Sequence, residues 1–170
     1  MKIPSIEPPD SHHLSCAIGW LELGSPGDAL DDLELVTAAL REHPDVLEVR
    51  WQIYARMANW DLALTTARQL LTQAPERASG WIHQAYSLRR AQGGGLDSAW
   101  SALKQALARF PKEPIIPYNL ACYAAQMNRL DEAWEWLHKA MEAAEDVDRI
   151  KQMALMDADL VGLHDRLKKL

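Results

Sequence analysis

Several patterns that mark particular classes of protein are missing from this 170-residue sequence. No apolar run reaches the ~18 to 20 residues that a membrane-spanning helix needs. The N-terminal stretch MKIPSIEPPD lacks the charged and then apolar pattern of a secretory signal. Positive charge is also scarce, with 18 Lys and Arg against 24 Asp and Glu, whereas a nucleic-acid partner requires a basic face. We therefore expect a cytoplasmic protein that binds neither membranes nor nucleic acids.

The sequence has few of the residue patterns that hold metals or perform catalysis. It contains two cysteines but no Cys-x-x-Cys, and its six histidines form no His-x-x-x-His pair, so we predict no metal ligands and no cofactor. We expect Cys16 and Cys122 to be free, buried thiols inside helices, which suits a reducing compartment. An enzyme would require Cys122 to meet a histidine such as His83. We predict no catalytic residue.

Glycine is concentrated at one place, Gly93-Gly94-Gly95. A phosphate-binding loop would need a preceding strand and a following Lys-Ser/Thr, and neither is present. The triplet therefore predicts a turn between two helices.

Helical patterns are abundant, and the clearest of them lies between residues 114 and 144. Leu120, Ala121 and Ala124 share one helical face. After a polar turn, apolar residues again recur at intervals of three and four, as in an amphipathic helix. A single helical hairpin cannot bury such a stripe, so it should stack on others. With one Phe and few β-branched runs, the chain is predicted to be all-α.

Small residues repeat at a regular spacing along the chain. Ala29, Ala63, Ala99 and Ala133 each lie near the start of a second helix, and they are 34, 36 and 34 residues apart. In this respect the chain resembles the tetratricopeptide repeat (TPR) family, whose ~34-residue repeat has small residues at the helix crossing and a proline near its end. Proline follows twelve residues after two of these alanines, at Pro75 and Pro111.

The resemblance implies a right-handed α-α superhelix of about four helix-turn-helix repeats with C-terminal capping helices. We expect an extended lead-in over residues 1–10, with Ser11 capping the first helix. The first pair should have a second helix that continues to His43. The predicted repeats are 11–44, 45–76, 77–112 and 113–145, followed by capping helices over 146–170. Trp51 replaces the small residue that the family has at this position, so the second repeat should pack differently.

In the TPR family the first helices of successive repeats line a groove that holds peptides. Carried over to this sequence, the groove positions also include Leu14, Glu22, Glu48, Ile82 and Cys122. The residues we predict to bind a peptide are Ile18, Gln52, Arg56, Tyr86, Arg89, Arg90, Tyr118 and Gln126.

The predicted function is a non-enzymatic module that binds a protein or peptide. Because arginine pairs well with carboxylates and tyrosine adds rigid contact area, we predict an acidic segment or a C-terminal carboxylate as the ligand. The arginines could instead pair with Glu48, Glu22 or neighbouring acidic residues of the chain itself. An alternative function is a small TPR chaperone for a secreted or aggregation-prone client. Association into a homo-oligomer is also possible.

Overall fold

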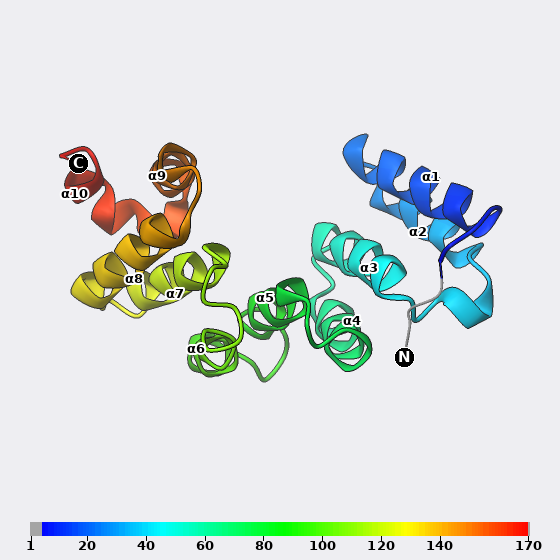
Figure 1. Cartoon of the computed structure of the whole chain (residues 1–170), viewed down its shortest axis with the longest axis horizontal. Coiled ribbons are helices and arrows are strands. Elements are labelled where there is room, and N and C mark those ends of the chain that lie inside the picture. The colour runs from blue at the N-terminus through cyan, green and yellow to red at the C-terminus, as the bar shows by residue number, and fades with distance from the viewer. Residues whose placement is uncertain (1–4, 170) are drawn as a thin grey trace. The chain divides into compact units, whose positions relative to one another are not determined.

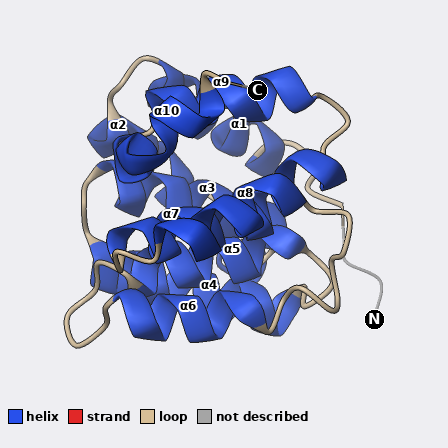
Figure 2. Cartoon of the chain, turned by 90° about the vertical axis from the view of Figure 1, so that its left-hand side faces the viewer, coloured by secondary structure: helices blue, strands red, loops and turns tan. Residues whose placement is uncertain are grey.

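The computed structural model describes residues 5–169, and within that range every regular element is a helix (Figure 2). The α-helices are α1 (Asp10–Glu22), α2 (Pro26–Glu34), α3 (Pro44–Arg56), α4 (Trp60–Gln73), α5 (Ala78–Leu88), α6 (Leu96–Lys104), α7 (Ile115–Gln126), α8 (Leu130–Ala143), α9 (Val147–Met156) and α10 (His164–Leu167). Two short 3₁₀ helices complete the list, η1 (Ala38–Leu40) and η2 (Ala158–Leu163). The predicted all-α class is confirmed.

The chain forms two compact units, residues 1–94 and residues 95–170. In the N-terminal unit α1 packs on α2, α3 on α4, and α4 on α5 (Figure 1). In the C-terminal unit α7 packs on α8 (Figure 1). The division falls inside the glycine triplet, so the helices of the predicted third repeat, α5 and α6, belong to different units.

The repeated alanines lie where neighbouring helices must come close together. Ala29, Ala63, Ala99 and Ala133 are fully buried, and each lies in the second helix of its predicted repeat. A larger side chain at these positions would force packed helices apart. The regular spacing of these alanines therefore reflects the close helix crossing in each repeat, as the sequence predicts.

The turns within three helix pairs have the same backbone geometry. The second residue after the first helix adopts a positive φ, of 78° at Gly24, 53° at Ala58 and 60° at Asn128. The next amide then donates to a carbonyl five residues back, as Asn59 N–H does to the Tyr54 oxygen at 2.9 Å. Asn59 also caps α4, because its side chain accepts from Leu62 N–H at 3.4 Å, as the sequence predicts.

The predicted length of the second helix was wrong in the first pair. α2 ends at Glu34 instead of continuing to His43, and the chain passes through η1 before α3 begins at Pro44. The buried Asp10 carboxylate accepts from the Thr37 amide at 2.6 Å and from its hydroxyl at 3.0 Å. These bonds hold Thr37 in an extended conformation with ψ of 137°, which ends the helical backbone there.

The two ends of the chain differ from the prediction by small amounts. Helix α1 begins at Asp10 after Pro9, so Ser11 is not its cap, and residues 1–4 of the expected lead-in lie outside the described residues. Helix α9 agrees with the sequence, and Asp157 caps the next turn by accepting from the Asp159 amide at 2.9 Å. That turn is η2, and only residues 164–167 of the predicted last helix are α-helical.

Across residues 5–169, no helix is long and apolar enough to cross a membrane.

Candidate functional site

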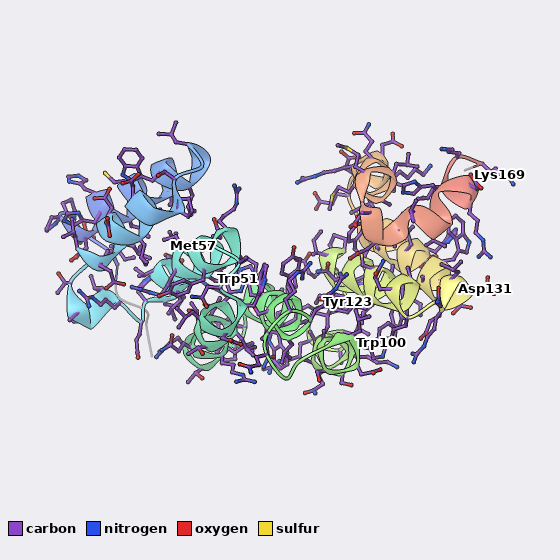
Figure 3. The ribbon with its side chains drawn as sticks, turned by 180° about the vertical axis from the view of Figure 1, so that it is seen from behind. Trp51, Met57, Trp100, Tyr123, Asp131 and Lys169 are labelled. Carbon is purple, nitrogen blue, oxygen red and sulfur yellow. The ribbon has the colours of Figure 1, made fainter. Side chains whose placement is uncertain are left out.

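A cluster of aromatic rings joins α3 to α5 in the N-terminal unit. Trp51 lies on α3 (Figure 3) and stacks on His83 of α5, with ring centroids 3.6 Å apart and an interplanar angle of 6°. Trp51 also forms a T-shaped pair with Tyr86, with ring centroids 6.0 Å apart. The indole N–H donates to the hydroxyl of the buried Ser87 at 2.9 Å. Trp51 therefore packs between repeats, which is how the second repeat accommodates so large a residue.

A carboxylate also bonds to the histidine of this cluster. Glu48 of α3 lies 2.7 Å from His83 Nε2 and also accepts a hydrogen bond from Ser79. Burial alone would raise the pKa of Glu48, but the hydrogen bonds from His83 and Ser79 outweigh it, so its pKa is lowered below the ordinary value. Glu48 is therefore an anion engaged within the unit.

Arg90 lies just beyond α5 and differs from Glu48 in having no charged partner among the described residues. Its guanidinium stacks 3.7 Å from the Tyr86 ring centroid and 5.1 Å from that of Trp60. Its Nη1 donates to the Tyr86 carbonyl at 3.0 Å. Among residues 5–169, no carboxylate forms an ion pair with Arg90. Its remaining N–H donors are therefore available to an external acceptor.

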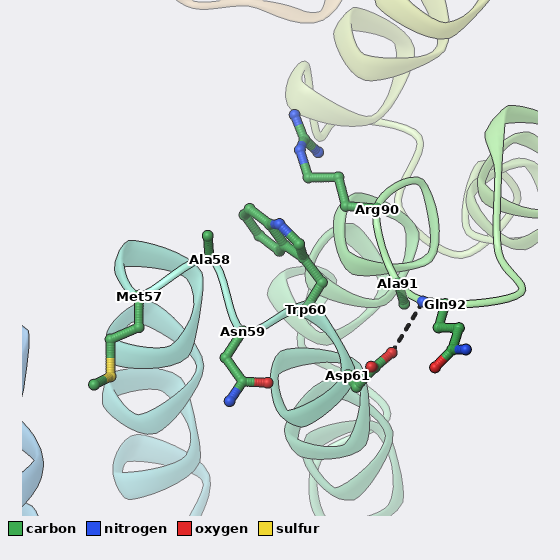
Figure 4. Close-up of a pocket in the computed structure, with 8 residues that line it drawn as sticks. All are labelled: Met57, Ala58, Asn59, Trp60, Asp61, Arg90, Ala91 and Gln92. Atoms are coloured by element: carbon green, nitrogen blue, oxygen red, sulfur yellow. Dashed lines mark hydrogen bonds between the residues drawn. The ribbon is translucent and has the colours of Figure 1, made fainter.

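Arg90 borders a shallow pocket of about 560 Å³ at the turns that follow α3 and α5. Trp60 and Arg90 project to the same side of this pocket (Figure 4). On its other side Asp61 accepts from the Gln92 amide at 3.0 Å, which ties the two turns together (Figure 4). The remaining lining residues are Met57, Ala58, Asn59 and Ala91. The pocket thus combines an unpaired cation with an aromatic and an apolar wall.

Other residues predicted to bind a peptide lie elsewhere in this unit. Arg56 lines a separate pocket of about 190 Å³ with Leu21, Gly24 and Pro26, and no described carboxylate pairs with it. The self-pairing alternative is thus not seen for Arg56 or Arg90. Gln52 is exposed on α3, Ile18 is 41% exposed on α1, and Arg89 is the C-terminal cap residue of α5. Arg56 and Arg90 line two pockets and not one.

In the C-terminal unit the predicted residues are already in contact with the chain itself. Tyr118 is only 5% exposed, and its hydroxyl donates to Asp157 at 3.0 Å. Gln126 is exposed, and its side-chain amide lies 3.4 Å from the Asp159 carbonyl. Tyr118 therefore does not line an open groove, because residues of the C-terminal cap bond to it.

The cysteines divide between two environments. Cys122 is buried, as predicted, and its thiol lies 3.5 Å from Asp157. The thiol of Cys122 and the carboxylates of Asp157 and Asp159 lie within 4.8 Å of one another, but Asp157 already accepts from three donors there. Cys16 is exposed, so the prediction that it is buried was wrong. It lies on the side of α1 away from the buried Ala17 and Leu21.

Sequence reasoning missed Trp60 and the joint role of Trp51 and His83. The missed signal is that bonded pairs lie one repeat apart in sequence: Trp51 and Ser87 differ by 36 positions, and Glu48 and His83 by 35. Residues at such a separation occupy equivalent places in neighbouring repeats and therefore meet across them.

No protein-family model matches the chain, and no curated protein does so either. Solved structures do match. TTC0263, a thermophilic TPR protein of Thermus thermophilus, is 24% identical with a TM-score of 0.70, and the match covers 96% of this chain and 83% of that one. A MamA protein matches with 16% identity, a TM-score of 0.66, and coverage of 94% and 86%. MamA MSR-1 matches with 23% identity, a TM-score of 0.61, and coverage of 77% and 74%. Together with the adjacent helix pairs, these matches show that the chain has the fold of a tetratricopeptide repeat protein.

Proposed function

We propose that this chain is a non-enzymatic protein-interaction module whose N-terminal unit binds an acidic peptide segment at Arg90. The observation that carries the proposal is the state of the Arg90 guanidinium. It is held flat against Tyr86 at 3.7 Å, and no described carboxylate neutralises it. An arginine already fixed in place loses little side-chain entropy when it binds a carboxylate.

The surroundings of Arg90 favour a peptide over a free anion. Trp60 and the 46%-exposed Met57 border the same pocket and offer apolar contact beside the charge. Aromatic residues and arginine together carry much of the binding energy at protein interfaces. The acidic group of the ligand would pair with Arg90, and a neighbouring apolar side chain would cover Trp60. A carboxylate at a C-terminus or on a side chain would serve equally in the first role.

Fluorescence anisotropy with labelled acidic peptides tests this proposal on the full chain. Each acidic peptide is compared with a form in which asparagine and glutamine replace the acidic residues, and each is made with a free and with an amidated C-terminus. We expect Arg90→Gln to weaken acidic-peptide binding about tenfold or more, because a charged hydrogen bond is lost. Arg68→Gln is the matched control, since Arg68 is an exposed residue of α4 outside this pocket.

The salt dependence supplies a second criterion. Binding through Arg90 should weaken as ionic strength rises, because the pair is partly exposed and is screened. Equal binding to wild type and Arg90→Gln would refute the proposal, as would equal binding of acidic and amide peptides. The proposed compartment is the cytoplasm, where free thiols such as Cys16 and Cys122 persist.

A chaperone is the second candidate, and exposed apolar residues of the first helix pair favour it. Ile18 is 41%, Leu23 77% and Leu35 60% exposed. Such residues would bind an unfolded client without a charged anchor. In that case Ile18→Ser/Leu23→Ser should abolish suppression of client aggregation, whereas Arg90→Gln should leave it intact.

A further inference from the structure

In the C-terminal unit, helix α6 ends earlier than its counterparts in the neighbouring repeats. It has nine residues and stops at Lys104, whereas α4 and α8 have fourteen each. Beyond it the Ala106 and Arg109 amides each donate to a carbonyl three residues back, at 3.0 Å, as in a 3₁₀ turn. Leu107 and Phe110 therefore leave the regular path of a long second helix.

This irregular stretch forms one wall of an open pocket of about 380 Å³, and α8 forms another. The lining residues are Leu107, Phe110, Pro111, Pro117, Trp136, Lys139, Glu142 and Ala143. The two aromatic walls thus come from the second helix of a repeat or from the turn that follows one. The pocket is therefore distinct from the groove predicted along the first helices.

Trp136 gives the pocket a ring that the other repeats lack. It follows the buried Ala133 by three positions, where the earlier repeats have Asp32, Thr66 and Ala102. The indole is only half-buried, although its helix has a complete buried stripe without it. Packing of the repeat therefore does not require a tryptophan at this position.

Two ammonium groups lie over the indoles at this pocket. Trp100 of α6 (Figure 3) forms a T-shaped pair with Trp136, with ring centroids 5.9 Å apart. Lys139 Nζ is 4.1 Å from the Trp136 centroid, and Lys104 Nζ is 5.7 Å from that of Trp100. Within residues 5–169, no carboxylate forms an ion pair with either lysine. Two cations of a chain with net charge −6 thus remain unpaired beside an aromatic wall.

The lining chemistry favours proline among the segments that a partner could present. Apart from Lys139 and Glu142, the lining side chains are aliphatic, aromatic or proline. A polyproline II segment brings apolar rings, needs no backbone partner, and loses little entropy because its conformation is already formed. A helical ligand would need a row of anchors over several turns, for which this pocket is too small.

We propose that this pocket binds a proline-rich segment of another protein, in the polyproline II conformation, with one acidic residue beside the prolines. The proline rings pack against Trp136 and Phe110, and the acidic side chain pairs with Lys139. Glu142 on the rim repels a segment that is acidic throughout. The site is separate from Arg90, and neither proposal depends on the other.

The first measurement uses fluorescence anisotropy with a labelled Ala-Pro-Pro-Glu-Pro-Ala peptide on the full chain. An Arg90→Gln background removes the other proposed site. The control peptide Ala-Ala-Ala-Glu-Ala-Ala keeps the acid, and Ala-Pro-Pro-Gln-Pro-Ala keeps the prolines. We expect the alanine form to bind about tenfold more weakly, because it lacks the rings and the preformed conformation. The glutamine form should bind about threefold more weakly, since an exposed ion pair contributes little.

Substitutions in the same background test whether the peptide binds at this pocket. Trp136→Leu should weaken binding about tenfold or more, because it removes the central aromatic contact. Trp134→Leu is the matched control, since Trp134 is half-buried on the same helix and pairs with His138 outside the pocket. It should change binding less than about twofold. Circular dichroism checks that both variants remain helical.

Lys139→Gln tests the pocket without disturbing the packing, because Lys139 is exposed. This variant should weaken binding of the glutamate peptide about threefold and leave the glutamine peptide unchanged. Lys168→Gln, an exposed lysine of the same unit outside the pocket, should change neither. Hydrogen exchange of the amides of residues 105–110 should also slow when the glutamate peptide binds.

Four outcomes would overturn the proposal. Equal affinity for the proline and alanine peptides would show that the pocket does not recognise proline. Equal losses from Trp136→Leu and Trp134→Leu, or unchanged exchange over residues 105–110, would place the peptide elsewhere. A dimer in sedimentation that the peptide dissociates would make the occupant a second copy of this chain, through its own Glu7-Pro8-Pro9.

Discussion

The inner positions of α5 and α7 are equivalent in sequence but differ in what contacts them. Tyr86 of α5 stacks on Arg90, which lies two residues past the end of that helix, and no described carboxylate pairs with the arginine. On α7, Tyr118 and Gln126 contact Asp157 and Asp159 of the same chain. On α7 the acceptors come from the cap that follows in sequence, because residues of that cap return to the helix within the C-terminal unit. The repeat that contains α5 thus offers the charged donor Arg90. In the repeat that contains α7, the donors Tyr118 and Gln126 already bond to acceptors of the same chain.

The largest effect should come from removing the apolar anchor of the cap. Leu163 is fully buried in η2, so Leu163→Ala should cost about 2–5 kcal/mol of unfolding free energy. Urea denaturation measures that loss, and Cys122 labelling should accelerate with it. Val161→Ala is the control, because Val161 is 67% exposed and should change stability by less than about 0.5 kcal/mol. Equal effects of the two substitutions would contradict the buried placement of Leu163.

The corresponding test in the N-terminal unit concerns Trp51. Trp51→Phe keeps an aromatic ring beside His83 but leaves the buried Ser87 hydroxyl without its indole donor. We expect a loss of about 1–3 kcal/mol in unfolding free energy. In a double-mutant cycle measured by urea denaturation, Trp51→Phe/Ser87→Ala should cost less than the two single changes together. Strictly additive losses would show that the hydrogen bond contributes nothing.

The two units should also respond to opposite ends of the pH scale. The pKa of Glu48 is lowered, so its stabilisation is present above the ordinary value of 4.5 and is lost as pH falls through the lower pKa of the folded state. Burial, together with Cys122 and Asp157, raises the pKa of Tyr118 above its ordinary 10.0. Its stabilisation is therefore complete below pH 10.0 and is lost as pH rises above that value.

Thermal unfolding across pH tests both effects with one variant each. Glu48→Gln should flatten the loss of stability at acidic pH and leave the alkaline side unchanged. Tyr118→Phe should flatten the alkaline side alone. A Glu48→Gln variant that loses stability toward acid as steeply as wild type would contradict the lowered pKa.

The smallest expected effects lie in the two turns that precede α4 and α8. Ala58 and Asn128 both have positive φ, which glycine adopts without strain and asparagine tolerates better than alanine. Ala58→Gly should therefore stabilise the chain by about 1 kcal/mol, and Asn128→Ala should destabilise it by about 0.5–1 kcal/mol. Both changes are measured by urea denaturation, and the same sign for both would contradict the shared turn geometry.

Local and periodic features of the fold could be predicted from the sequence. The spacing of Ala63 and Ala133 identified the helix crossings, and Asn59 identified the start of α4. What failed depends on contacts between distant residues. Nothing near Thr37 indicates that Asp10, 27 positions earlier, ends α2 by bonding to it. Cys16 was placed on the wrong side of α1 because the helix is apolar around much of its circumference.

The candidate sites were predicted only in part for the same reason. Helical spacing placed Tyr86 and Arg90 on one face of a helix, and the structure stacks them. Helical spacing could not show that Trp60, from another turn, would lie beside Arg90. Nor could it show that the cap would bond to Tyr118, since the partner Asp157 is 39 residues away. Periodicity indicates which residues share a helix face but not what covers that face.

The hydrogen bond between the Asp10 carboxylate and the Thr37 amide makes that amide a reporter of local opening at the N-terminal edge of the repeat array. Thr37 lies outside any helix, in an exposed stretch where backbone amides normally exchange quickly with solvent deuterium. Its amide is nevertheless bonded to a buried carboxylate at 2.6 Å. It should therefore exchange only when that bond opens. The exchange rate of this single amide, compared with that of the buried Leu33 amide inside α2, would measure how often the end of the array frays independently of the helices behind it.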